Sequence, residues 1–171
     1  MDFECTVSMN KDCVPVIIET PKGSTEKYAY DDDHRCFKLH KILPSGMVFP
    51  YDFGFIPGTK GDDGDPLDVI VFSEYKSFPG CLMDCRIIGG IKAEQISANK
   101  KKKERNDRFV AIPALSKTFA DIAEMADLAA EKMNELQEFF INYNRQAGKV
   151  FKPLGAINSK KAIKLIDSQR K

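Results

Sequence analysis

The sequence predicts an α+β fold, mainly β, in which a small sheet or barrel carries helices on its outside. Segments with the alternating, β-branched composition of strands fill the chain up to about residue 112. In the C-terminal third, apolar residues recur three or four positions apart, which is the period of a helix. Because strands come first and helices follow, the order favours a sheet covered by helices over alternating β–α–β units.

Three strands are expected in the N-terminal part of the chain. The apolar run at residues 14–19 predicts the first, and Pro and Gly at 21–24 predict a turn after it. Residues 27–30 alternate as a short second strand, which ends at the three aspartates 31–33. Residues 37–43 alternate again and predict the third strand.

The middle of the chain is expected to hold an irregular segment, three strands and one loop. Residues 47–58 are dense in aromatic residues, Gly and Pro, which predicts a packed but irregular conformation. Strands are expected near residues 68–72, 81–93 and 107–112. The basic run at 100–105 is predicted to be a solvated hairpin loop between the last two.

Two helices are expected in the C-terminal third. Gly148 is the stop signal of the first, and Ser159 is a suitable N-cap for the second. The apolar face of the first helix comprises Ile122, Met125, Ala129, Met133, Leu136, Phe140 and Tyr143, and that of the second comprises Ala162, Ile163, Leu165 and Ile166.

The composition is that of one ordinary globular domain. Of 171 residues, 43% are apolar and 30% are charged, which is enough to bury a core. We find neither an internal repeat nor a linker, so residues 1–171 are expected to form a single domain. The formal net charge of +1 argues against nucleic acid or an anionic membrane as the main partner.

Three further features favour a cytoplasmic protein. The apolar runs are all shorter than the 18 residues that a membrane span requires. The N-terminal residues 1–5 are partly acidic and lack the apolar stretch of a signal peptide. The five cysteines are odd in number and include no C-x-x-C pair, which is typical of reduced thiols.

An acidic cluster at residues 62–68 is the most informative feature of the chain. It holds four aspartates and runs directly into the apolar segment 69–72. Two like charges about 4 Å apart repel by roughly 4 kcal/mol at an effective dielectric near 20. A fold that gathers several carboxylates beside its core therefore needs protonation, a basic cluster or a bound divalent cation to offset that repulsion.

The spacing within this cluster favours a hard cation. In an extended backbone Asp63 and Asp65 point to the same side, and Asp68 lies at the entrance of the following strand. All-oxygen ligands suit Mg²⁺ or Mn²⁺. The pattern fails the calcium EF-hand test, because Leu67 occupies a ligand position and Asp68 the glycine position. An ordinary Asp-rich surface turn is the alternative.

Cations and further carboxylates lie in other expected strands. Lys27, Lys41 and Arg108 could clamp an anionic, phosphate-like substrate beside the aspartates. Lys149 and Lys152 could do the same, although exposure is the simpler interpretation. Glu19, Glu94 and Asp107 lie within or at the ends of expected strands, and a small barrel could direct them to the same cavity.

Several other site classes lack their sequence signals. The chain contains no G-x-S-x-G, no G-x-G-x-x-G and no P-loop pattern, so nucleophilic serine and dinucleotide or P-loop sites are unsupported. Only two histidines are present, which argues against a His-rich zinc or iron site.

At this point the chain resembles the family I soluble inorganic pyrophosphatases. Residues 63–69, DGDPLDV, resemble the family's DGDPxDV motif. Four other segments resemble family segments in the same order along the chain: VIIETP at 16–21, KY at 27–28, FPYDFGFIP at 49–57 and FFINYN at 139–144. The resemblance therefore covers nearly the whole chain.

This resemblance implies a five-stranded OB-like barrel flanked by a long and a C-terminal helix. It also implies hydrolysis of pyrophosphate to two phosphates, dependence on several Mg²⁺ ions with Mn²⁺ as a possible substitute, and a homo-oligomer, favouring the hexamer of the bacterial branch. Two alternatives stay open. One is a pyrophosphatase-like module that binds metal and phosphate with little or no turnover, and the other is hydrolysis of a different phosphoanhydride.

Site residues follow from the resemblance position by position. Asp63, Asp65 and Asp68 resemble metal ligands, and Asp65 also resembles the group that deprotonates the nucleophilic water. Glu19 resembles the outer acidic residue of the cavity. The residues that resemble ligands of the two phosphates are Lys27, Lys41, Arg108 and Tyr143.

The chain also departs from the family pattern. Lys41 replaces an arginine, and Ala29 replaces an acid. Phe49 and Phe53 replace tyrosines, and Asn144 replaces a lysine.

A later acidic pair of the family is also altered. Direct spacing puts Gln95 and Asn106 where aspartates usually stand, whereas a shift of one residue would supply Glu94 and Asp107 as metal ligands instead. We favour the shift at this point.

Overall fold

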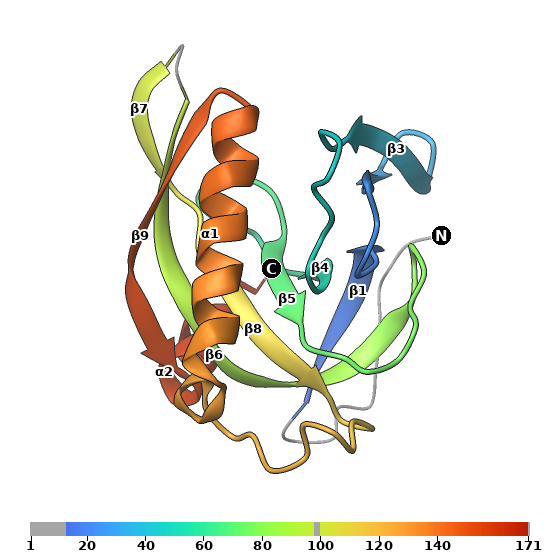
Figure 1. The fold of residues 1–171 in the computed structure, drawn as a ribbon, viewed down its shortest axis with the longest axis vertical. Coiled ribbons are helices and arrows are strands. Elements are labelled where there is room, and N and C mark those ends of the chain that lie inside the picture. The colour runs from blue at the N-terminus through green and yellow to red at the C-terminus, as the bar shows by residue number, and fades with distance from the viewer. Residues whose placement is uncertain (1–12, 98–99, 171) are drawn as a thin grey trace.

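A computed structural model of the chain describes residues 13–97 and 100–170. Residues 1–5, which the sequence predicts not to be a signal peptide, lie outside this part. Within the described ranges no helix is long and apolar enough to cross a membrane. The α+β, mainly β prediction is confirmed, because strands hold more of the chain than helices do, and both α-helices lie in the C-terminal third, with one strand between them (Figure 1).

The main sheet closes on itself. The strand Val14–Thr20 pairs on one side with the strand Asp52–Ile56 and on the other side with the start of the strand Leu82–Ser97, which closes the path. Five strands thus form a ring, which is consistent with an OB-like fold. In ring order these are β1 (Val14–Thr20), β4 (Asp52–Ile56), β5 (Leu67–Val71), β8 (Arg108–Pro113) and β6 (Leu82–Ser97).

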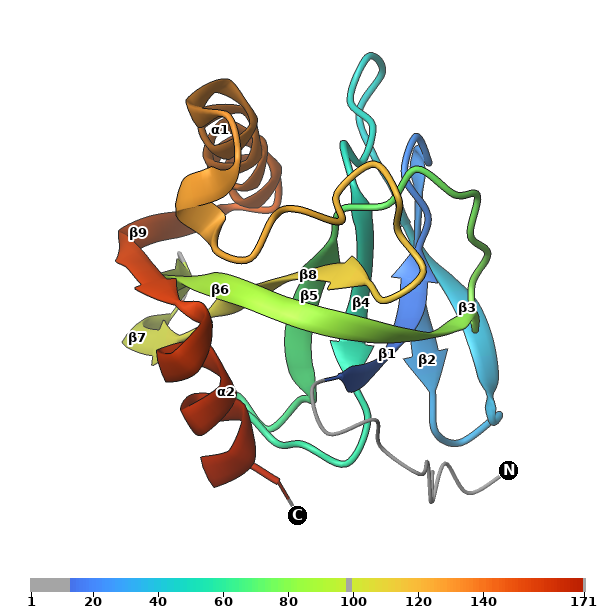
Figure 2. The same ribbon diagram turned by 90° about the horizontal axis from the view of Figure 1, so that it is seen from below.

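Strand β6 belongs both to the ring and to an extension beyond it. Its later residues pair with β7 (Lys100–Arg105) and β9 (Lys149–Asn158), on the opposite side of the molecule from β1 (Figure 2). At Gly89 the register shifts and φ is +151°. A Cβ there would lie 2.6 Å from the carbonyl oxygen of Ile157, so only glycine fits this close approach.

A separate hairpin stands beside the ring. It consists of β2 (Glu26–Asp31) and β3 (Cys36–Ile42), and its register places Lys27 opposite Lys41. In both views the ring strands β4 and β5 lie between this hairpin and α1 (Ala130–Gln146) (Figures 1 and 2). The hairpin therefore presents its two lysines from one side of the ring and the helix presents its residues from the other.

Three predictions about strands are corrected by the structure. The segment 47–58 is packed as expected, but β4 lies within it; every residue of β4 is buried, so no alternation marks it. The basic run at 100–105 is β7 rather than a loop. Strand β9 was not expected, because it contains Pro and Gly and its residues are mostly exposed.

The first helix begins later than its apolar spacing predicts. Ile122 and Met125 precede α1, and Met125 lies in a short 3-10 turn, η1 (Met125–Asp127). Side chains compete with the helix here: the Asp127 carboxylate accepts the N–H groups of Ala123 and Glu124 at 3.0 and 2.8 Å. The predicted end of the helix is confirmed by Gly148, whose φ is +68°.

The final helix is confirmed, but its cap is one residue earlier than predicted. The helix is α2 (Ser159–Ser168), and the Asn158 side chain accepts the N–H of Lys161 at 3.0 Å. Ser159 instead donates its backbone N–H and its hydroxyl to the Glu124 carboxylate, at 2.8 and 2.6 Å. These two bonds attach the start of α2 to the segment that precedes α1.

Candidate active site

The acidic cluster forms a tight turn between β4 and β5. The Gly61 N–H donates to the carbonyl of Asp65 at 2.7 Å, and the Asp65 N–H donates to the Asp63 carboxylate at 3.2 Å. Gly64 has a φ of +94°, which closes the turn. The turn leaves the side chains of Asp63 and Asp65 exposed and places Asp68 as the second residue of β5.

The charges of the aspartates affect the pKa of Glu19 on β1. Burial raises the pKa of Glu19, Lys27 and the Tyr30 N–H lower it, and the charges of Asp68 and Asp65 raise it again. Asp63 is accessible to solvent but partly desolvated, which raises its pKa; the Asp65 N–H lowers it, and the charges of Asp68 and Asp65 raise it again. Glu19, Asp63, Asp65 and Asp68 therefore lie in one electrostatic neighbourhood.

These carboxylates do not converge on a single point in the described structure. Within residues 13–97 and 100–170, no three Asp, Glu, His or Cys side chains are arranged to hold one metal ion. Asp68 instead forms an ion pair with Arg108 Nη1. The donor chemistry nevertheless fits a hard divalent cation, because the acids are oxygen ligands that repel one another.

Arg108 is the central cation of the site. Strands β5 and β8 are parallel neighbours with Val69 opposite Phe109, so Asp68 and Arg108 come together one residue earlier. Arg108 is only 6% exposed. Three aromatic rings surround its guanidinium, with centroids 5.8, 5.5 and 6.0 Å away; they belong to Phe53, Phe140 and Phe151.

Two lysines of the hairpin lie over rings of one larger aromatic cluster, in which Phe49 contacts both Phe53 and Tyr143. Lys27 Nζ lies 5.1 Å from the ring centroid of Phe53, and Lys41 Nζ lies 4.7 Å from that of Tyr143. Burial lowers the pKa of Lys41, and the charges of Lys27 and Lys149 lower it further. Lys149 and Lys152 are both exposed on β9, and Lys149 lies close enough to Lys41 to affect its pKa.

The two candidate pairs at the β6–β7 hairpin have different partners. The Asn106 amide donates to Gln95 Oε1 at 3.2 Å and accepts from Arg108 Nη1. The Asp107 carboxylate accepts the N–H of Ala93 at 3.0 Å and Arg105 Nε at 2.5 Å. Hydrogen bonds therefore bring Gln95 and Asn106, the pair that direct spacing selects, to Arg108 and Asp68.

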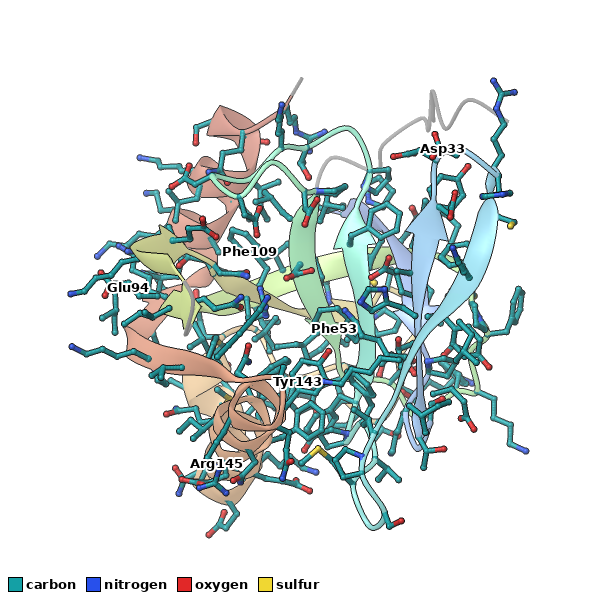
Figure 3. All side chains as sticks on the ribbon, turned by 90° about the horizontal axis from the view of Figure 1, so that it is seen from above. Asp33, Phe53, Glu94, Phe109, Tyr143 and Arg145 are labelled. Carbon is teal, nitrogen blue, oxygen red and sulfur yellow. The ribbon has the colours of Figure 1, made fainter. Side chains whose placement is uncertain are left out.

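Asp107 and Glu94 differ in their distance from the acidic turn. Asp107, like Asn106, lines a hollow together with Asp63 and Asp68. Glu94 lies 4.0 Å from Lys103 Nζ, and in Figure 3 it is at the outer edge of the view, while Phe53 and Tyr143 lie toward its centre.

Sequence reasoning missed the aromatic enclosure of Arg108. Phe140 was expected only as part of a helix face, and Phe151 lies on the unexpected strand β9. No alternation of apolar and polar residues marks this segment, because Val150 and Phe151 are both apolar and Val150 is exposed. Of the substituted positions, Asn144 is buried and its amide donates to the Phe140 carbonyl at 2.8 Å, so it supports α1 rather than facing the cations.

Comparison with known proteins identifies the family of this chain. The family model described as inorganic pyrophosphatase matches residues 16–171. The chain belongs to that family. A curated inorganic pyrophosphatase from Synechocystis sp. is 39% identical over 142 residues, which cover 83% of this chain and 80% of that protein. One from Nostoc sp. is 34% identical over 158 residues, covering 92% and 90%.

Solved structures of other proteins share the fold. The inorganic pyrophosphatase from Thermus thermophilus superposes with a TM-score of 0.84 at 31% identity, covering 94% of this chain and 90% of that one. The structure from Anaplasma phagocytophilum superposes with a TM-score of 0.85 at 26% identity, covering 95% and 94%. Family membership supports pyrophosphate hydrolysis, and the comparisons lend no support to a binding module without turnover.

Proposed function

We propose that this protein hydrolyses inorganic pyrophosphate to two phosphates with a metal-activated water. The observation that carries the proposal is that an acidic and a basic group of side chains meet at the ion pair of Asp68 with Arg108. Glu19 and the aspartates at 63, 65 and 68 supply the acids, and Lys27, Lys41 and Arg108 supply the cations around the aromatic cluster.

The acidic group would hold the metal. We propose Mg²⁺, with Mn²⁺ as a substitute, held by Asp63, Asp65 and Asp68 with Glu19 as an outer acid. Asp107, which lines the hollow, and Glu94 are further candidates on the side of β6. A bound divalent cation would supply charge neutralisation and a more acidic water.

The remaining residues would bind and orient the substrate. Lys27, Lys41 and Arg108 neutralise the oxygens of the two phosphoryl groups, and Tyr143 contributes its hydroxyl. Asp65 accepts the proton of the attacking water; the new P–O bond forms as the bridging P–O bond breaks. Positioning and electrostatic stabilisation account for most of the catalysis expected in phosphoryl transfer.

Phosphate release from pyrophosphate with Mg²⁺ tests the proposal. We expect Asp65→Asn to lower kcat by about 100-fold or more, which is the range for losing a general base. Asp62→Asn is the matched control, because it makes the same chemical change on an exposed side chain of the same turn. Equal activity of the wild type and Asp65→Asn, or binding of pyrophosphate by the wild type without turnover, would overturn the proposal.

We also propose a cytoplasmic homo-oligomer, with the hexamer favoured by the resemblance to the bacterial branch. The thiols of Cys36, Cys81 and Cys85 suit a reducing compartment. Exposed apolar side chains such as Phe78 and Leu115, which are 63% and 82% exposed, are available for contacts between copies. Light scattering should give about six times the chain mass of 19.2 kDa; the mass of a single chain would contradict the oligomer.

A further inference from the structure

The polar contacts of the Arg108 guanidinium are all made by one of its three nitrogens. Among the described residues, its three polar partners all contact Nη1: Asp68 Oδ2, Asn106 Oδ1 and the Asp107 carbonyl, the last at 3.2 Å. Nε is buried without a hydrogen-bond partner in the described part of the chain. The contacts therefore fix one corner of the guanidinium and leave Nη2 for another acceptor, such as an anionic oxygen.

The Arg108 contact also fixes the orientation of two amides. An arginine can only donate, so Asn106 must turn its oxygen toward Nη1 and its NH₂ group away. That NH₂ donates to Gln95 Oε1 at 3.2 Å, so Gln95 must present its oxygen as well. Strand β6 carries Gln95, and the Asn106 N–H donates to the Ala93 carbonyl of the same strand at 3.0 Å, which anchors the pair.

We propose that Gln95 and Asn106 are positioning residues that hold Arg108 ready for a phosphate oxygen of the substrate. This inference rests on the proposed function. The oxygen of Asn106 that could serve a cation is already used by the guanidinium, and that of Gln95 is used by Asn106. The pair therefore orients the phosphate-binding arginine and is not part of the metal site.

Binding of methylenediphosphonate, a pyrophosphate analogue without a hydrolysable bridge, tests the inference by calorimetry in the presence of Mg²⁺. Asn106→Ala removes a hydrogen bond to a charged group and should weaken binding by about tenfold. Gln95→Met should weaken it by a smaller factor, because the amide of Asn106 loses its orienting acceptor. Gln95→Glu keeps that acceptor and should restore most of the affinity.

A double variant separates positioning from a general structural effect. In the Asn106→Ala background, Gln95→Met should cause no further loss, because no amide remains to be oriented. In the turnover assay, Asn106→Ala should raise KM for pyrophosphate while the Mg²⁺ concentration for half-maximal activity stays unchanged. Thermal unfolding of each variant checks that the fold is retained.

Several results would overturn the inference. These are additive losses in the double variant, no rescue by Gln95→Glu, a changed Mg²⁺ requirement in Asn106→Ala, and absence of analogue binding by the wild type. Analogue binding by the wild type without pyrophosphate hydrolysis has a different meaning. That result would overturn the proposed function alone, and the comparison of variants would still decide the role of the amide pair.

Discussion

Lys41 differs from the family pattern at a position that we propose to bind a phosphate of the substrate. The ammonium group carries the charge of the arginine that the family pattern has here, but it lacks the two-pronged geometry that pairs with phosphate oxygens. Its neighbours are the ring of Tyr143 and the charges of Lys27 and Lys149. Burial and these two charges lower the pKa of Lys41, so its positive charge is lost at a lower pH than that of an exposed lysine.

We therefore expect Lys41→Arg to lower KM for pyrophosphate several-fold and to extend activity toward alkaline pH. The sign follows from the pKa: as pH rises, Lys41 deprotonates early and its contribution to substrate binding disappears, whereas arginine stays charged. KM measured across the pH range for both proteins checks this. Lys38→Arg, an exposed position of the same strand, is the control; an equal alkaline shift in the control would contradict the role given to Lys41.

At the scale of elements, the sequence predicts what local chemistry determines. The alternating strands, the final helix and the stop at Gly148 all follow from spacing and conformational preference. The predictions are wrong for segments whose structure is determined by tertiary contacts. Strand β4 is buried throughout, so alternation is absent, and β9 becomes a strand because it pairs along β6. The sequences of β4 and β9 therefore carry no local pattern that predicts a strand.

Gly89 is the element-scale feature with the clearest cost of substitution. We expect Gly89→Ala to lower the free energy of unfolding by about 2 kcal/mol, because the new Cβ meets both the Ile157 carbonyl and the Met125 side chain. Gly46→Ala is the control: its φ is +86° with open space around it, so it measures backbone strain alone, at about 1 kcal/mol. Urea unfolding of both variants checks this, and equal losses would show that crowding at β9 is unimportant.

At the scale of the whole molecule, the site is assembled from segments far apart in the chain. The acidic turn could be recognised from residues 62–68 alone, since its spacing and its position before a strand carry the chemistry. The partner of Asp68 could not be recognised from the sequence, because the pairing of Asp68 with Arg108 requires β5 and β8 to be parallel neighbours. The choice between Asn106 and Asp107 likewise depends on which side of the β6–β7 hairpin each residue faces.

The same assembly predicts that a divalent cation stabilises the folded protein. In the folded protein burial raises the pKa of Glu19 and of Asp63, the charges of Asp68 and Asp65 raise both further, and the unfolded chain has no such cluster. A cation that binds only the folded state at 100 times its Kd adds about 2.7 kcal/mol, which for a chain of this size raises Tm by roughly 5–10 °C. Thermal unfolding with Mg²⁺, against NaCl at equal ionic strength, measures this shift without reference to activity. Asp65→Asn should reduce the shift and Asp62→Asn should retain it; a shift of equal size in NaCl would show that screening, not a metal site, relieves the repulsion.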